Sequence, residues 1–189
     1  MSSDELVDLP AEWLSQSGPV EIDLGCHKGT FLVAMAQAEP GVRFLGIERQ
    51  SSRVEKCLSK ISRLGLSNAW AIRREGLGGL RLPGLRTIHV SFPDPWPKRR
   101  HWDRRLVNAA FLKEVWEALE PGGTLRLMTD DGPYFLAMQD ALARFDGFQE
   151  TAWDDGREYP KTEFQKRFEA ESKPIYRVAL ARCDSRSSE

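Results

Sequence analysis

Residues 20–48 read VEIDLGCHKGTFLVAMAQAEPGVRFLGIE. The stretch opens with a short β-rich run (Val20–Gly25), continues into a helical pattern after Gly29, and closes with a second β-rich run (Val42–Glu48). A strand, a helix and a strand in this order form the βαβ unit, whose two strands run parallel because the helix carries the chain back to the same edge. The stretch therefore predicts the start of a parallel, helix-covered sheet.

The same alternation continues toward the C-terminus. Further strands are expected at Ala69–Ile72, Arg86–Phe92, Thr124–Asp130, Phe148–Trp153 and Ile175–Ala181. Helices are expected at about Ser52–Leu64, at about Arg105–Leu119, from Pro133 onward and at Thr162–Glu171. Strands that alternate with helices in this way predict an α/β fold: a doubly wound, Rossmann-like, mostly parallel seven-stranded sheet with helices on both faces.

Two helices carry recognisable signals at their ends. Ser52 followed by Glu55 has the spacing of a capping box, and Gly65 stands where a left-handed C-terminal cap is expected. Thr162 and Gln165 repeat the capping-box spacing at the start of the last helix. These signals predict where the two helices begin and where the first of them ends.

Length and composition favour one domain. The chain has 189 residues, of which 41% are hydrophobic and 29% charged, which excludes disorder along the whole chain. We expect the domain at residues 19–182, between a short acidic segment (1–18) and a polar tail (183–189), both frayed at their ends. No apolar run approaches the roughly 18 residues of a membrane helix, and no secretory signal is visible. A cytoplasmic protein without membrane contact is expected.

The cysteines and charges narrow the range of partners. Cys26, Cys57 and Cys183 are far apart and form no C-x-x-C pair, which argues against a disulfide framework and a structural zinc site, so no metal is expected. A net charge of -1 gives no overall attraction to nucleic acid. A local basic patch is nevertheless present: Lys98, Arg99, Arg100, Arg104 and Arg105. A nucleic acid would bind there.

The residues that end the strands are the first candidates for a site, because ligands in this fold bind at the carboxyl ends of the strands. The loop Asp23–Gly29 reads DLGCHKG, which lacks the G-x-G-x-x-G of dinucleotide sites. An acid ending the first strand, Gly25 and Gly29, and Glu48 ending the second strand instead resemble the S-adenosylmethionine site of Rossmann-like methyltransferases. The alternative is a tight turn without ligand and a solvated strand end.

Residues 91–106 read SFPDPWPKRRHWDRRL. Three prolines within five residues restrict the backbone directly after a strand and hold Asp94 at the mouth of the site. This segment closely resembles the signature of the bacterial tRNA (guanine-N7-)-methyltransferase family. The resemblance runs from Glu21 to about Val178 and includes two further motifs: T-D at Thr129–Asp130 and T-E-F-Q at Thr162–Gln165.

The resemblance implies a function and a set of site residues. The implied reaction transfers a methyl group from S-adenosylmethionine to N7 of a guanosine in the variable loop of tRNA, at tRNA position 46. The implied cofactor-binding residues are Asp23, Gly25, Gly29, Glu48, Glu75 and Asp94. Asp94 is also the implied catalytic residue. The implied substrate contacts are Lys98, Asp130, Thr162 and Gln165, and the basic residues Arg99, Arg100, Arg104 and Arg105 are the expected RNA-binding patch.

The chemistry of guanine makes this reaction intelligible. N7 carries a lone pair and no proton, so in-line attack on the sulfonium methyl needs no base to expose the nucleophile. The N1–H and the exocyclic amine of guanine form a pair of donors that one carboxylate, Asp94 or Asp130, can accept together. Because the base is recessed in folded RNA, it must be extracted, and the candidate stacking partners are Trp96, Trp102 and Tyr134. The alternative for these rings is core or surface packing, which we favour for Trp102 and Tyr134.

Three positions depart from the pattern of the family. His27 replaces the middle glycine of the first loop, Glu75 stands where an aspartate is usual, and Gln165 replaces a glutamate. His27 is expected either to crowd the cofactor or to point outward. Two competing functions stay open: a catalytically weak homologue that serves as an RNA-binding module, and a methyltransferase for another substrate, since a fold alone does not select the substrate. A monomer is favoured.

Overall fold

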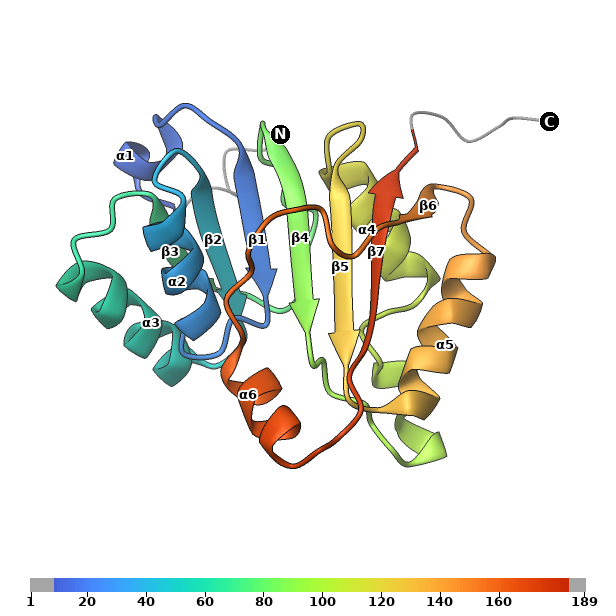
Figure 1. The fold of residues 1–189 in the computed structure, drawn as a ribbon. Helices are drawn as coiled ribbons and strands as arrows, with labels where there is room; N and C mark the ends of the chain where they lie inside the picture. Colours follow the sequence, from blue (N-terminus) through green and yellow to red (C-terminus); the bar gives the residue numbers. More distant parts are fainter. Residues whose placement is uncertain (1–8, 184–189) are drawn as a thin grey trace.

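The computed structural model describes residues 9–183 of the chain. Within this range seven strands form one sheet in the order β3-β2-β1-β4-β5-β7-β6 (Figure 1). The strands are β1 (Val20–Leu24), β2 (Arg43–Glu48), β3 (Ala69–Arg73), β4 (Leu85–Ser91), β5 (Thr124–Thr129), β6 (Phe148–Thr151) and β7 (Tyr176–Arg182). β7 runs antiparallel to β5 and β6, and the other neighbours are parallel. The expected mostly parallel, doubly wound sheet is confirmed.

Helices cover both faces of this sheet. They are α1 (Ala11–Leu14), α2 (Thr30–Ala38), α3 (Ser51–Arg63), the 3-10 helix η2 (Arg99–Arg104), α4 (Ala109–Ala118), α5 (Gly132–Ala143) and α6 (Glu163–Ala170). α2 and α3 lie over β2 and β3, α4 and α5 lie behind the other half of the sheet, and α6 lies at the edge where the arrows of β1 and β4 end (Figure 1). No helix within residues 9–183 is long and apolar enough to span a membrane.

The hydrophobic core is divided between the two faces. The larger cluster joins Ile22, Ile88 and Leu125 of the sheet to Leu112 of α4 and Met138 of α5. The smaller cluster lies under α2 and α3 and includes Met35, Phe44, Val54 and Ile61. One face of the central strands is therefore apolar along its whole length.

The opposite face of β1, β4 and β5 is polar. Glu21, His89 and Arg126 alternate with the core residues along their strands, so they point away from α4 and α5. Their exposed fractions are only 0%, 4% and 3%. The connection between β6 and α6 crosses this face in front of β5, β4 and β1 (Figure 1). We call residues 152–161 of this connection the strap.

Two expectations about helix starts are wrong. The helix expected from Arg105 begins at Ala109, because the Asn108 side chain accepts a hydrogen bond from the Phe111 N–H (3.0 Å) and caps the helix there. The capping box expected at Ser52 does not form: α3 follows Gln50, whose side chain makes no capping bond. The basic residues before α4 form η2 instead.

Other local expectations are confirmed. Gly65 has φ +63°, the left-handed conformation of a C-terminal cap, and directly follows α3. Thr162 caps α6, since its Oγ1 accepts a hydrogen bond from the Gln165 N–H (3.0 Å). Part of the 1–18 segment packs onto the domain, because Leu9 and Trp13 are buried in the larger core cluster. The fraying expected for the N-terminal segment is therefore wrong for the part that contains α1, and residues 1–8 and 184–189 lie outside the described range.

Candidate active site

A cavity of about 590 Å³ opens at the carboxyl ends of β1, β2 and β4. Its walls contain four of the expected cofactor-binding residues: Gly25, Glu48, Glu75 and Asp94. These residues are spread over seventy positions of the chain, and they meet because parallel strands place their carboxyl ends at one edge of the sheet. The structure thus brings these four residues together at one cavity, and their role in binding a cofactor stays a prediction.

Glu48 is held firmly at the wall of this cavity. Its carboxylate is buried, accepts a hydrogen bond from the Gln50 N–H (2.9 Å), and lies 3.5 Å from the Arg53 Nη1. A backbone N–H and a guanidinium fix the two oxygens in place, and carboxylate oxygens keep capacity to accept further hydrogen bonds. The arrangement suits recognition of hydroxyl groups.

Asp23 lies beside the cavity rather than in its wall. It lines a crevice of about 30 Å³ together with Gly25 and Thr162. Burial raises the pKa of Asp23 to about 7, and the charge of Glu48 adds to this effect. Near neutral pH this carboxyl group is therefore divided between its charged and neutral forms.

The first loop contains the departure at His27. This residue has φ +53°, a conformation that favours glycine, so the side chain is carried at some backbone strain. The imidazole lines the cavity, packs edge-on against Phe164 with centroids 5.6 Å apart, and places Nδ1 3.7 Å from the Glu163 Oε2. Burial and the charge of Arg53 lower the pKa of His27, so the ring is neutral at pH 7. The ring connects the first loop to α6.

Gly29 has a packing role in this loop. It precedes α2 with φ +72°, and a Cβ atom at this position would collide with the Cys57 Sγ on α3. Gly29 is not part of the wall of the 590 Å³ cavity. The glycine is required because the loop lies directly against α3.

Asp94 projects from the proline-rich segment at the cavity. Its side chain is 65% exposed, and its Oδ2 lies 3.2 Å from the Arg49 Nη2. η2 holds the segment from behind, since Arg105 Nε donates to the Pro95 carbonyl (2.9 Å) and the Arg104 guanidinium lies 5.1 Å from the Trp96 ring centroid. Asp94 is thus an accessible carboxylate on a braced backbone.

One expectation about this region is wrong, and one candidate stacking residue proves to be a packing residue. Arg105 is only 7% exposed, and its guanidinium lies against the rings of Trp102 (4.6 Å) and Tyr134 (4.9 Å), so it anchors η2 and is not available to RNA phosphates. Tyr134 is fully buried and its hydroxyl accepts a hydrogen bond from the Val107 N–H (3.1 Å), so it is not available to stack on a base. Trp102, at 43% exposed, remains accessible.

The expected substrate contacts fall into two groups. Thr162 and Gln165 line a second cavity, of about 340 Å³, which also includes Ser91 at the end of β4. Gln165 Nε2 donates to the Glu169 Oε1 (3.1 Å), and the Gln165 side chain accepts no hydrogen bond from the Thr162 N–H, so the capping box is only half formed. Two other expected contacts, Lys98 before η2 and Asp130 after β5, are not among the wall residues of either cavity.

Several residues of this region were not expected from the sequence. Phe164 lines the larger cavity from α6, Arg49 reaches Asp94, and Arg126 and Arg157 surround the smaller cavity. The sequence contained part of the information needed to find them. Apolar and polar residues alternate along β1, β4 and β5, which is typical of a strand with one polar face. Within residues 9–183 no cluster of histidine, cysteine and acidic side chains is arranged to hold a metal ion.

Comparison with known proteins adds the family. A family model described as "Putative methyltransferase" matches residues 17–178. Proteins named tRNA (guanine-N(7)-)-methyltransferase match from Rubrobacter xylanophilus (34% identity; 90% of this chain, 80% of the relative), Geobacter metallireducens (30%; 94% and 90%) and Escherichia coli (34%; 87% and 72%). The similarity therefore spans most of both partners in each comparison.

Solved structures show the same fold at lower identity. The aminoglycoside resistance methyltransferase NpmB1 is 21% identical with a TM-score of 0.62, covering 90% of both chains. An antibiotic-related methyltransferase is 20% identical with a TM-score of 0.63, covering 96% of this chain and 94% of the other. A Streptococcus mutans protein in complex with SAH is 15% identical with a TM-score of 0.56, covering 90% and 94%. At these identities the likeness shows a shared methyltransferase fold.

Proposed function

The chain belongs to the tRNA (guanine-N7-)-methyltransferase family, and from this membership we propose that it transfers a methyl group from S-adenosylmethionine to N7 of a guanosine in tRNA. The observation that carries the proposal is the convergence of Glu48, Glu75 and Asp94 on one cavity at the strand ends. The resemblance of residues 91–106 to the family signature supports the variable loop, at tRNA position 46, as the target. Because the proposed substrate is tRNA, we also propose that the enzyme acts in the cytoplasm.

The larger cavity fits the cofactor. Its volume of about 590 Å³ lies within the roughly 300–1,000 Å³ of small-molecule sites. Glu48 offers fixed acceptors for the two ribose hydroxyls, and Gly25, with φ +86° and open space where a Cβ would point, lets a ligand approach the loop. S-adenosylmethionine supplies an electrophilic methyl group on a sulfonium centre. Glu75 and Asp94 supply further polar groups to the wall of this cavity.

The protein's task toward guanine is to hold it. Because N7 carries no proton, no side chain has to act as a base. Asp94 is accessible at the cavity and can accept from N1–H and the exocyclic amine, and its charge stabilises the positive charge that methylation places on the purine. Trp96, also in the cavity wall, is a stacking partner for the extracted base.

Exposed cations on η2 are suited to tRNA phosphates. Arg99 and Arg100 are exposed and free of carboxylate partners within the part of the chain that the structure describes. Replacing both by alanine should weaken tRNA binding and lower its salt slope by about one for each phosphate that is no longer neutralised. Replacing Lys56 and Arg63, two exposed cations of α3 without a carboxylate partner within residues 9–183, serves as the charge-matched control. An equal change in slope for both pairs would mean that η2 is not the binding surface.

Mass spectrometry of nucleosides tests the activity itself. Unmodified tRNA is incubated with the protein and S-adenosylmethionine, digested, and analysed for 7-methylguanosine. We expect the product with a tRNA that carries guanosine in the variable loop and its loss when that guanosine is replaced by adenosine. Another methylated nucleoside, or cofactor binding without any methylated nucleoside, would favour a methyltransferase for another substrate. Failure to bind S-adenosylmethionine in calorimetry would favour a catalytically weak homologue that serves as an RNA-binding module.

A further inference from the structure

Two arginines that point in opposite directions hold the strap on the sheet. Arg126 reaches from β5 into the strap, whereas Arg157 reaches from the strap to Glu21 on β1 and to Glu39 after α2. The strap has no regular secondary structure, so these side chains replace the ladder of hydrogen bonds that would fix a strand.

Arg126 fills the inside of the strap. Its Nη2 donates to the Trp153 carbonyl (2.8 Å), and its Nη1 lies 3.4 Å from the Asp155 Oδ2. The guanidinium lies 4.1 Å from the ring centroid of Trp153 and 4.0 Å from that of Tyr159. A guanidinium stacks through its faces and donates in its plane, so one side chain contacts three strap residues at once. Arg126 therefore joins the strap to β5, while Tyr159 also packs against the smaller core cluster.

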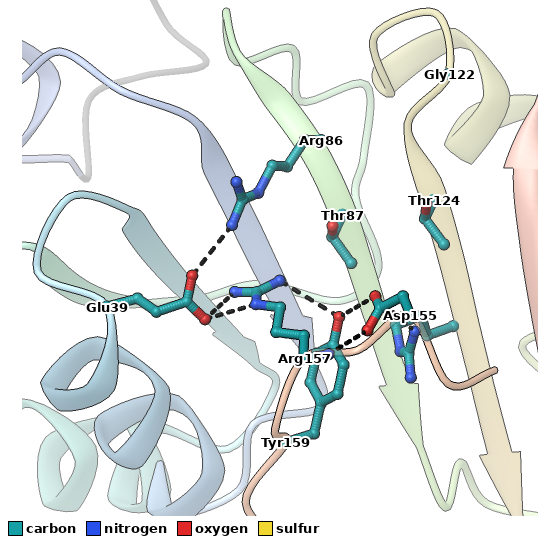
Figure 2. A pocket seen from close by; sticks show the side chains of 9 residues that line it. Glu39, Arg86, Thr87, Gly122, Thr124, Asp155, Arg157 and Tyr159 are labelled. Atoms are coloured by element: carbon teal, nitrogen blue, oxygen red, sulfur yellow. Dashed lines mark hydrogen bonds and ion pairs between the residues drawn. The ribbon is translucent and has the colours of Figure 1, made fainter. Parts of the chain in front are cut away.

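Arg157 compensates two acids, the buried Glu21 and the partly exposed Glu39. Its Nη1 donates to the Glu21 Oε1 and its Nε to the Glu39 Oε1, both at 2.6 Å. Figure 2 shows Arg157 between Glu39 and Tyr159, with Arg86 of β4 reaching Glu39 from above in this view. Removing the guanidinium would leave Glu21 with less compensation in a buried position, which is costly. Ion pairs therefore hold the strap on the sheet, and detaching it is energetically unfavourable because the buried Glu21 would lose compensation.

The strap leads directly into the substrate side of the site. Only two residues separate Tyr159, whose hydroxyl donates to the Asp155 Oδ2 (2.8 Å), from Thr162, a distance of about 10 Å of extended chain. The second of them, Lys161, is itself tied to α6 by its Nζ, which donates to the Glu169 Oε2 (2.6 Å). Thr162 caps α6, and the first residue of α6, Glu163, accepts a hydrogen bond from the Thr30 Oγ1 (2.6 Å). Thr162 and Gln165 share the 340 Å³ cavity with Arg126 and Arg157. A shift of the strap therefore displaces the start of α6.

We propose that Arg126 and Arg157 are positioning residues, which set the place of Thr162 and Gln165 for tRNA without touching the tRNA themselves. The inference rests on the proposed function for the identity of the substrate. Misplacement of a substrate-binding group by about 1 Å costs on the order of a hundredfold in rate, so loss of either anchor should affect the tRNA reaction strongly. The cofactor cavity takes only Phe164 from α6 and is otherwise built from other elements, so cofactor affinity should change far less than the tRNA reaction.

The test compares arginines of one network. Arg157→Met and Arg126→Met remove a strap anchor and keep the apolar stem. Arg86→Met is the matched control, because Arg86 also pairs with Glu21 (2.8 Å) and Glu39 (3.3 Å) but belongs to β4 and not to the strap. The three variants are compared by hydrogen exchange of residues 152–170, by calorimetry with S-adenosylmethionine, and by kinetics with tRNA.

We expect both strap variants to exchange faster over residues 152–170, to lose on the order of tenfold or more in kcat/KM for tRNA, and to keep cofactor affinity within about twofold. Arg157→Lys, which keeps one charge, should recover part of the loss. Arg86→Met should lower stability alone. Equal kinetic losses for Arg86→Met and Arg157→Met would overturn the proposal, as would normal kinetics in both strap variants. Hydrogen exchange needs no tRNA: unchanged exchange refutes the tether even if the proposed activity fails.

Discussion

Two acids on the same face of β1 have opposite electrostatic surroundings. Glu21 lies under the strap, where burial would raise its pKa, but hydrogen bonds and charge from His89 and Arg157 outweigh burial and lower the pKa to about 2. Asp23 lies two residues further along, at the edge that carries the site. There burial is reinforced by the charge of Glu48, and the pKa of Asp23 rises to about 7.

The difference separates charges that hold the fold from charges that serve the site. Under the strap, carboxylates and guanidiniums are compensated within the chain, so they bind one segment to another. At the edge, Asp23 has an acidic neighbour and Asp94 has one exposed arginine partner. Acids in a cleft that have perturbed pKa values or little compensating charge are typical of ligand-binding sites. Each of the substitutions that follow changes a side chain in one of these two regions.

The largest effect is expected at the edge. Asp94→Asn should lower kcat for tRNA by on the order of a hundredfold or more, because the amide removes the charge that offsets the developing cation. The melting temperature should not change, since the side chain is 65% exposed. Asp140→Asn is the control: Asp140 is also exposed and paired with a single arginine, Arg144 (2.9 Å), but lies on α5 away from the cavity. Equal activity of the two variants would remove Asp94 from catalysis.

The substitution Asp23→Asn should raise the free energy of unfolding above about pH 7. The folded pKa of about 7 exceeds the ordinary value of 3.8, so the contribution of Asp23 to stability is present below about pH 4 and is lost as pH rises through 7. Asparagine does not ionise and avoids this loss. The variant should therefore gain about 2 to 4 kcal/mol over the wild type at pH 8 and nothing at pH 4, measured by urea unfolding. A gain that does not depend on pH would contradict the assignment.

Glu21→Gln should show the opposite dependence. The folded pKa of about 2 lies below the ordinary 4.5, so the stabilisation is present above pH 4.5 and is lost as pH falls toward 2. The wild type should exceed the variant by about 3 kcal/mol at pH 7, and the two should converge near pH 2. If the difference persists in acid, the side chain stabilises by packing and the strap is not held by charge.

The two regions also differ in how far the sequence predicted them. Glu48, Glu75 and Asp94 were expected together because strand ends in a parallel sheet share one edge, which follows from topology alone. The strap was expected only as a loop: alternation in β1 and β5 indicates a polar face, but which segment covers it depends on contacts such as Arg126 with Trp153, made across long sequence separations.

Errors at individual residues have the same physical origin. The sequence placed Arg105 in a solvated basic run, but aromatic rings from η2 and α5 surround it in the structure. Burial of a long cationic side chain depends on neighbours that its own segment does not contain. His27 could not be placed for the same reason, since its position is decided by Phe164 and Glu163 on α6.

The smallest effect is expected at Gln165, where the strap side of the molecule meets the site. In Gln165→Glu, the new charge near the start of α6 gains about 0.3 to 1 kcal/mol from the helix dipole, while repulsion from Glu169 four residues later costs about 0.2 to 0.5 kcal/mol. The hydrogen bond from Gln165 Nε2 to Glu169 is also removed. The free energy of unfolding, measured by thermal denaturation, should therefore change by less than about 0.5 kcal/mol.

The kinetics of the same variant decide what Gln165 does. A carboxylate in the 340 Å³ cavity is a stronger acceptor for the N–H donors of guanine than an amide, so kcat/KM for tRNA should rise a few-fold while cofactor affinity stays constant. Gln165→Met, which fills similar space without an acceptor, should lower kcat/KM. If both variants match the wild type, then Thr162 and Gln165 only cap α6. In that case the strap leads into a helix with a purely structural role, and recognition of the base depends on the side chains around Asp94 alone.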